Sequence, residues 1–140
     1  MKKFRQAVFS AAKMFWNTSP LILGTILLVS LIVTLIPQSF YLKIFTQNIF
    51  LDSFLGGGLG SVSAGNPLIS YIIGGELLGM GVGLIAVTAF LVSWVTVGII
   101  QLPAESMILG KRFAIWRNVL SFVFAIVVAV TTYFLLGGVL

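Results

Sequence analysis

The stretch from Phe54 to Gly83 limits what this chain can fold into more than any other part of it. The stretch is apolar and carries no charge except Glu76. Each glycine inside a helix costs roughly 1 kcal/mol relative to alanine, so a cluster of glycines predicts a break in the helix. The clustered glycines are Gly56, Gly57, Gly58 and Gly60.

A new helix is expected directly after these glycines. Asn66 is a good N-cap, and Pro67 fits the first helical turn, where no backbone N–H is needed. Irregular backbone at membrane depth persists only where protein buries it or a wet cavity adjoins it. Residues of about 46–81 are therefore predicted to form a re-entrant helical hairpin that turns at the glycines.

The composition places the chain in a membrane. Hydrophobic residues make up 59% of the 140 residues and charged residues 8%, against about 25% charged residues in soluble domains. The predicted fold class is an all-α integral membrane protein with three transmembrane helices and the glycine-rich re-entrant hairpin. The chain contains no cysteine and no histidine, so we expect no metal site and no cofactor. No base–nucleophile pair is evident, so we expect no enzymatic activity.

Two domains are expected. Residues 1–17 are predicted to form an amphipathic helix on the cytoplasmic membrane surface; a simple basic flank that sets topology is the alternative. Residues 18–140 are predicted to form one membrane domain with spans at about 20–42, 82–102 and 119–137. Asn118 is expected to cap the last of these helices.

The basic residues predict the orientation. With a hairpin that does not cross, only Lys43 lies on the outer side, and the N-terminus lies in the cytoplasm. This bias favours the plasma membrane, the inner membrane in a bacterium, and needs no nucleic acid to explain the net charge of +5. Two full crossings in place of the hairpin would give the same bias. The residues expected on the cytoplasmic side are Lys2, Lys3, Arg5, Lys13, Lys111, Arg112 and Arg117.

Three glycines after the break recur every fourth residue: Gly75, Gly79 and Gly83. Such a ridge lets another helix approach closely, so these glycines are interpreted as a helix-packing surface. Glu76 adjoins the ridge. An ionisable residue at membrane depth is by default a functional candidate, and the alternative is an interfacial or protonated glutamate.

A second group of polar residues follows in the apolar run that ends near Pro103, where the helix should bend or end. Trp94, Gly98, Gln101 and Glu105 fall on one helical face. Glu105 is a candidate for binding a solute or cation, and its alternative role is an ion pair with Lys111 or Arg112. The predicted substrate- or ion-binding residues are Asn66, Ser70, Glu76, Thr96, Gln101 and Glu105.

Parts of this sequence resemble the predicted-permease family that includes the organoarsenical efflux permeases. The similar stretches are Gly65-Asn66-Pro67 through Glu76, Ala89 to Gly98, and Gln101-Leu102-Pro103-Ala104-Glu105. The resemblance covers about residues 18–138 and is strongest from Gly65 to Arg117. It singles out Asn66, Pro67, Glu76, Trp94, Gln101, Pro103 and Glu105.

That family joins two similar halves in one chain, and this chain resembles one half. The resemblance therefore implies transport of a small solute by an assembly of at least two copies. The absence of cysteine argues against a thiol-dependent arsenical mechanism, so the substrate is not carried over.

The sequence predicts a half-size permease whose partners are itself, as a homodimer or higher oligomer, or a second half-size subunit, together with membrane lipid. Its site would be built from broken helices. Two alternatives stay open. One is a small channel, and the other is a non-transporting accessory subunit that docks through the glycine ridge.

Overall fold

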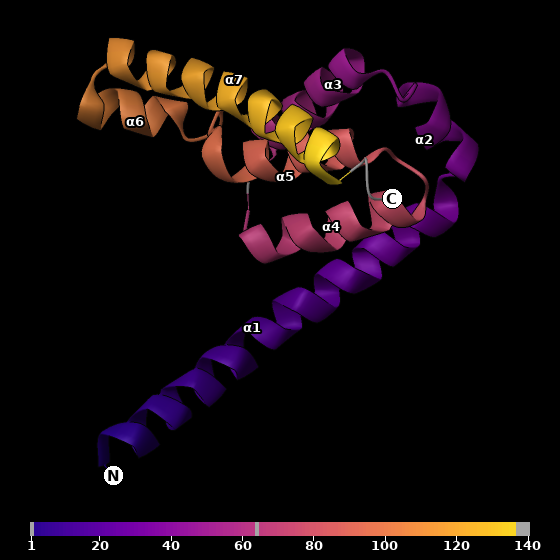
Figure 1. Cartoon of the computed structure of the whole chain (residues 1–140). Helices are drawn as coiled ribbons and strands as arrows, with labels where there is room; N and C mark the ends of the chain where they lie inside the picture. The colour runs from indigo at the N-terminus through magenta and orange to yellow at the C-terminus, as the bar shows by residue number, and fades with distance from the viewer. Residues whose placement is uncertain (1, 64, 137–140) are drawn as a thin grey trace. The chain divides into compact units, whose positions relative to one another are not determined.

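The computed structural model describes residues 2–63 and 65–136, which form seven α-helices and contain no strand (Figure 1). The chain divides into two units, Met1–Leu35 and Ile36–Leu140. The all-helical class predicted from the sequence is confirmed for these residues.

The first unit is a single helix, α1 (Lys2–Leu35), which continues through Pro20. Proline has no N–H to offer the carbonyl one turn earlier. The Ser19 hydroxyl donates to that carbonyl, on Trp16, at 3.1 Å, and the Thr18 hydroxyl donates to the carbonyl of Met14 at 2.8 Å. The expected division after residue 17 is therefore not a helix boundary, because the Ser19 hydroxyl satisfies the one carbonyl that Pro20 leaves free.

The second unit contains the other six helices. They are α2 (Gln38–Ile44), α3 (Ile49–Val62), α4 (Pro67–Gly79), α5 (Leu84–Thr96), α6 (Leu102–Leu109) and α7 (Lys111–Leu136). Two helices in the described residues are long and apolar enough to cross a membrane, Lys3–Leu35 and Lys111–Leu136. The predicted span at 82–102 contains α5, which has only 13 residues, fewer than the ~20 that a single crossing helix needs.

The prediction of a helix break at the glycine cluster is wrong. α3 runs without interruption through Gly56, Gly57, Gly58 and Gly60. A Cβ added at Gly56 would overlap the backbone carbonyl of Ala86 in α5, and one added at Gly60 would overlap the carbonyl of Phe90. Glycine here lets two helix backbones touch, and that packing compensates for its low helix propensity.

The turn of the hairpin lies further along, around Gly65. Asn66 caps α4 as predicted, because its side-chain oxygen accepts the N–H of Leu68 at 3.0 Å. α3 and α4 run in opposite directions and both pack on α5 (Figure 1). α4 packs there through Gly74, whose added Cβ would meet the side chains of Leu91 at 3.1 Å and Val87 at 3.2 Å.

The glycines predicted to form a packing ridge make no close contact within the second unit. Apart from neighbouring residues of their own helix, no described atom of that unit lies within 4 Å of a Cβ added at Gly75, Gly79 or Gly83. Gly83 is the N-cap of α5. A packing role for this ridge stays a prediction about contacts with another molecule.

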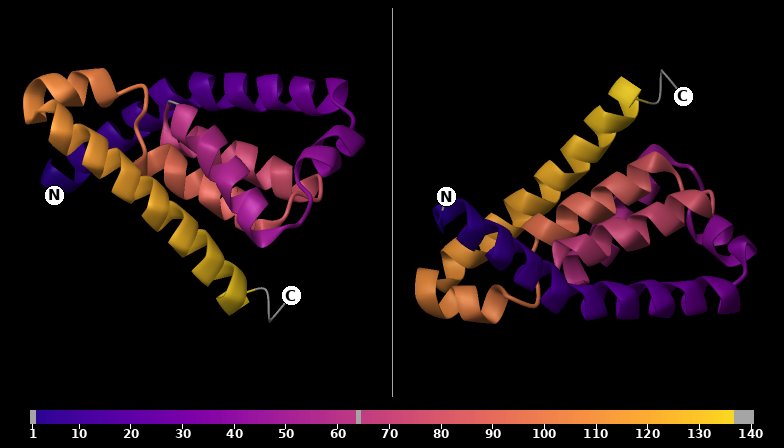
Figure 2. Two further views of the ribbon diagram at one scale, coloured as in Figure 1. Left: turned by 90° about the horizontal axis from the view of Figure 1, so that it is seen from above. Right: turned by 90° about the horizontal axis from the view of Figure 1, so that it is seen from below.

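α5 and α6 follow each other in the same general direction, with a sideways step between them at residues 97–101 (Figure 2). α7 returns in the opposite direction and packs against both of them. The reversal between α6 and α7 occurs at Gly110, whose φ of 89° favours glycine. α5, the step and α6 together span residues 84–109, as many residues as α7.

Side-chain hydrogen bonds hold the base of the hairpin, at the end away from Gly65. Asp52 is completely buried, and its carboxylate accepts the backbone N–H groups of Thr46 at 3.0 Å and Gln47 at 2.9 Å. At the end of α4, the Gln38 amide donates to the carbonyl of Met80 at 2.8 Å. The two arms of the hairpin, α3 and α4, are thus both tied to residues 38–47, which precede the hairpin.

Candidate functional site

The two interruptions in the second unit lie next to each other. The turn of the hairpin and the step between α5 and α6 share a small cavity of about 40 Å³. A long hydrogen bond of 3.5 Å, from the indole Nε1 of Trp94 to the carbonyl of Gly65, joins them. The side chains and backbone that line this cavity belong to Ser63, Gly65, Trp94, Val95, Val97, Gly98, Ile100 and Gln101.

Asn118 of α7 holds the step in place. Its side-chain oxygen accepts the N–H of Gly98 at 2.9 Å, and its amide nitrogen donates to the Ala114 carbonyl at 3.0 Å. The side chain is 5% exposed. A backbone N–H left unpaired at this depth would be costly, so Asn118 stabilises the interruption. The prediction that Asn118 caps a helix is wrong, because α7 begins at Lys111 and Asn118 lies inside it.

Gln101 closes the cavity on the side of the step. Its side chain folds back over Gly98, where an added Cβ would meet the Gln101 amide oxygen at 2.9 Å. Gln101, Gly98 and Trp94 were predicted to share a face of one helix. The structure places all three on one cavity although the helix is interrupted between them.

Glu105 lies one turn beyond the step and forms an ion pair with Arg117. Arg117 donates from Nε to Oε2 at 3.0 Å and from Nη2 to the same oxygen at 2.7 Å. The expected partners were Lys111 and Arg112. The antiparallel turn at Gly110 instead brings Arg117, in the second turn of α7, opposite Glu105.

Three other predicted binding residues, Ser70, Thr96 and Glu76, lie apart from the cavity. Ser70 is buried and its hydroxyl donates to the Pro67 carbonyl at 2.7 Å. Thr96 is exposed and donates to the Val92 carbonyl at 2.7 Å. Glu76 is exposed on α4, near the base of the hairpin. Asn66 adjoins the cavity but uses its side-chain oxygen as the cap of α4.

Pro103 does not cause the interruption. It occupies the first turn of α6, after the step has already occurred. Val97 at the end of α5 and Gln101 before α6 mark the ends of the step. Proline fits the start of α6 because no N–H is needed there.

The chemistry of the small cavity is that of neutral hydrogen-bonding groups. Its walls carry a hydroxyl, an indole, an amide and backbone groups, and no charged side chain. A volume of about 40 Å³ holds only a few waters or a small ion. The described residues contain no cluster of three or more acidic side chains that could bind a metal.

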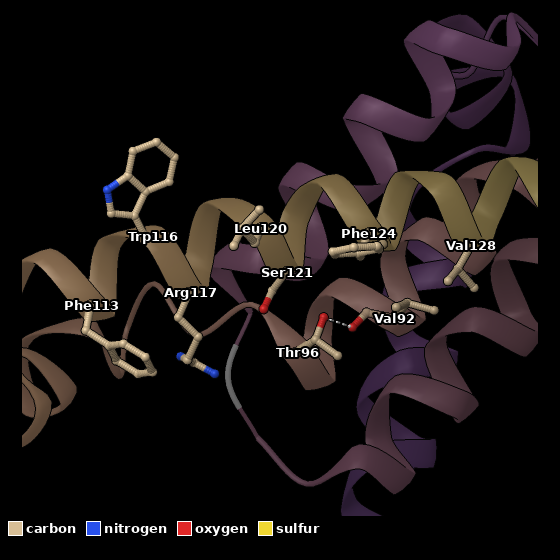
Figure 3. Close-up of a pocket in the computed structure, with 10 residues that line it drawn as sticks. Val92, Thr96, Phe113, Trp116, Arg117, Leu120, Ser121, Phe124 and Val128 are labelled. Carbon is tan, nitrogen blue, oxygen red and sulfur yellow. Dashed lines mark hydrogen bonds between the residues drawn. The ribbon is translucent and has the colours of Figure 1, made fainter.

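A larger hollow lies between α5 and α7. This groove has a volume of about 460 Å³ and is mostly apolar, with Arg117 toward one end and Val128 toward the other (Figure 3). Thr96 and Val92 line it from α5. The predicted residue Thr96 therefore belongs to this groove and not to the small cavity.

Comparison with protein-family models, with curated proteins and with solved structures gave no match for this chain.

Proposed function

We propose that this chain is a half-size membrane permease that oligomerises and moves a small polar solute or ion past the cavity where its two interruptions meet. The observation that carries the proposal is this meeting of a hairpin turn and a broken helix, joined by Trp94 and Gly65 and lined by neutral polar groups. Discontinuous helices near the middle of the bilayer are where many transporters bind their substrates. Transport of a small solute is also the function that the resemblance to the permease family implies.

Helix lengths support burial of the hairpin turn. α7 is about 39 Å long with its 26 residues. α5 and α6, with 13 and 8 residues, come to about 32 Å without the step, so each of the two paths is long enough to cross a hydrocarbon core of ~30 Å. α3 has 14 residues and α4 has 13, so each is only about 20 Å long. A hairpin of such arms enters and leaves on one side, with its turn inside the bilayer.

Charge supports the orientation. Lys111 and Arg112 begin α7, and three lysines or arginines lie among residues 3–13 of α1. Placing both groups in the cytoplasm puts the base of the hairpin on the outer side. The cavity then lies about 20 Å below the outer surface, at the depth that α5 reaches with 13 residues.

An assembly of copies is supported by the exposed face of α4. Gly75 and Gly79 leave this face smooth, and Glu76 is exposed beside them. A carboxylate facing lipid is costly, so this face should meet either protein or water. A second copy placed there would shelter Glu76 and complete a pathway that one small cavity cannot provide.

Cysteine accessibility tests the proposal, because the chain has no native cysteine. We would introduce Ser63→Cys at the cavity and Val62→Cys at an exposed apolar position beside it. A membrane-impermeant maleimide would be applied to either side of oriented vesicles. We expect label at position 63 from at least one side, changing with the solute present, and none at position 62, where lipid keeps the thiol dry.

Gln47→Cys, near the base of the hairpin, is the control for this experiment, and it should react only from the outer side. If position 63 reacts as fast as position 47 from that side, the turn lies outside the membrane and the proposal fails. In liposomes, Gln101→Ala should lower the flux of whichever ion or small neutral solute is moved, while Gln6→Ala in α1 should not.

The same open face of α4 also fits a second candidate, an accessory subunit of a larger membrane complex. In that case Gly79→Leu would release the larger partner. Gln101→Ala would then leave the activity of the complex unchanged. Gln101→Ala therefore separates the two functions, because Gly79→Leu disrupts the contact on this face in either case.

A further inference from the structure

We infer that the groove between α5 and α7 binds one anionic phospholipid from the cytoplasmic leaflet. The inference rests on the membrane orientation proposed above, but not on transport. Its site is distinct from the cavity at the interruptions, because the two share no lining residue.

The shape of the groove suits an acyl chain. Val92 of α5 and Phe124 and Val128 of α7 lie along it (Figure 3), and Leu120 and the fully buried Ala125 also line it. The distance along α7 from Arg117 to Val128 is about 16 Å. That distance is close to half of the ~30 Å hydrocarbon core, the depth of one leaflet.

The end of the groove suits a phosphate. Arg117 lines it, and its Nε and Nη2 bind Glu105 while Nη1 takes no part in those bonds. Lys111 and Arg112 are exposed in the first turn of the same helix, and the exposed Trp116 lines the groove next to Arg117. Basic pockets between membrane helices on the cytoplasmic side bind anionic lipid headgroups, and tryptophan favours the headgroup level.

A second copy of the chain fits the groove less well. The chain has only three acidic residues. Asp52 is completely buried and Glu105 is already paired with Arg117. Glu76 remains, but it lies near the base of the hairpin, at the outer side in the proposed orientation. Parallel copies would therefore bring no carboxylate to Arg117, whereas a phospholipid brings a phosphate.

Glu105 and the phosphate compete for one guanidinium. Replacing Glu105 by glutamine removes the internal anion and leaves Arg117 free to bind the phosphate. We expect Glu105→Gln to strengthen the preference for anionic lipid. If the basic surface attracted anionic lipid only diffusely, replacing any one of its charged residues would change the lipid preference by the same amount.

Tryptophan quenching by brominated lipids measures occupancy directly. The variant with Trp16→Phe and Trp94→Phe keeps Trp116 as its one fluorophore. It would be placed in phosphatidylcholine vesicles that contain phosphatidylglycerol, with bromine on the acyl chains of one lipid or the other. We expect brominated phosphatidylglycerol to quench Trp116 with about a fivefold preference over its share of the lipid, the effect expected of one basic residue.

Two matched variants test which positive charge produces the preference for anionic lipid. Arg117→Gln should remove the preference. Arg112→Gln, an exposed arginine on the same helix that does not line the groove, should leave it within about twofold because exposed charge is screened. Equal losses in the two variants would overturn the inference in favour of a diffuse basic surface.

A second reporter separates failure of this inference from failure of the proposed function. Val123 is exposed on α7 outside the groove, so Val123→Trp in a background without the native tryptophans reports insertion alone. If neither lipid quenches that reporter, the chain is not inserted and the membrane orientation fails as well. If the reporter is quenched but Trp116 is not, no lipid occupies the groove and only the lipid inference is overturned.

Discussion

The two arms of the hairpin use glycine in opposite ways. In α3, Gly56 and Gly60 lie directly against the backbone of α5. In α4, Gly75 and Gly79 face open space, and only Gly74 packs on α5. Spacing by four residues is the same in both arms, so spacing alone does not tell which arm is packed within the chain.

The difference shows what decides the role of a glycine in such a helix. Close packing between helices in lipid depends on van der Waals contact over small residues. α5 meets Gly56 and Gly60 of α3 with backbone atoms of Ala86 and Phe90, whereas it meets Gly74 of α4 with the side chains of Val87 and Leu91. Contact between backbones therefore needs a glycine on one helix only, provided that the side chains of the other helix point away from it, as at Phe90. Gly75 and Gly79 thus stay uncovered within the second unit, and a contact with another molecule there stays a proposal.

The largest effect should come from Gly60→Ala. Its methyl group would overlap the carbonyl of Phe90 and force α3 away from α5. We expect a loss of about 3 kcal/mol, at the upper end of overpacking, measured by thermal unfolding in detergent. Gly58→Ala is the matched control on the same helix, because no described atom lies within 4 Å of its Cβ. Equal stability of the two variants would show that α3 does not touch α5.

Gly79→Leu should disrupt assembly and not folding. The side chain has open space in the single chain, so the unfolding temperature should be unchanged. If copies meet on this face, light scattering in detergent should show the oligomer lost or weakened by about tenfold or more, because overpacking a tight contact costs about 1–3 kcal/mol and 1.4 kcal/mol is a factor of ten. An unchanged oligomer would show that α4 does not form the interface.

Gly74→Ala should have an intermediate effect. Its Cβ would meet only side-chain atoms, at 3.1–3.2 Å, and these can shift. Crowding opposes the gain in helix propensity, so we expect a change within about 1 kcal/mol. Differential scanning calorimetry in detergent can measure it. A loss as large as that of Gly60→Ala would mean that α4 is packed as tightly as α3.

Gly79→Ala should have the smallest effect and the opposite sign. Alanine restricts the unfolded chain and meets nothing in the folded one. A gain of about 0.5–1 kcal/mol is expected, detectable as a small rise in unfolding temperature at protein concentrations where the chain is monomeric. A clear loss of stability would show that another part of the chain or a second molecule packs against α4 at Gly79.

The local signals in the sequence were sufficient for the start of α4 and for the all-helical class. Asn66 and Pro67 act within one turn, so their effect can be read without tertiary information. The position of the hairpin turn could not be read in this way. Its prediction at Gly56–Gly60 relied on helix propensity, which the contact with α5 overrides.

The candidate site was predicted in part. Trp94, Gly98 and Gln101 were grouped correctly, since residues spaced by three or four stay close even when the helix steps sideways. Asn118 and Asp52 were not recognised, because their roles depend on residues brought near by folding. The one available signal was an amide within the apolar sequence of α7, which invites a search for its hydrogen-bond partner.

The hydrogen bonds of Asp52 and Gln38 have a mechanical consequence. They anchor the hairpin at its base, while the far end is restrained by the long bond between Trp94 and Gly65. An element fixed at one end bends most at the other. We therefore expect amide hydrogen exchange to be faster near Gly65 than near Asp52, and the cavity to change size through small displacements of the hairpin's free end.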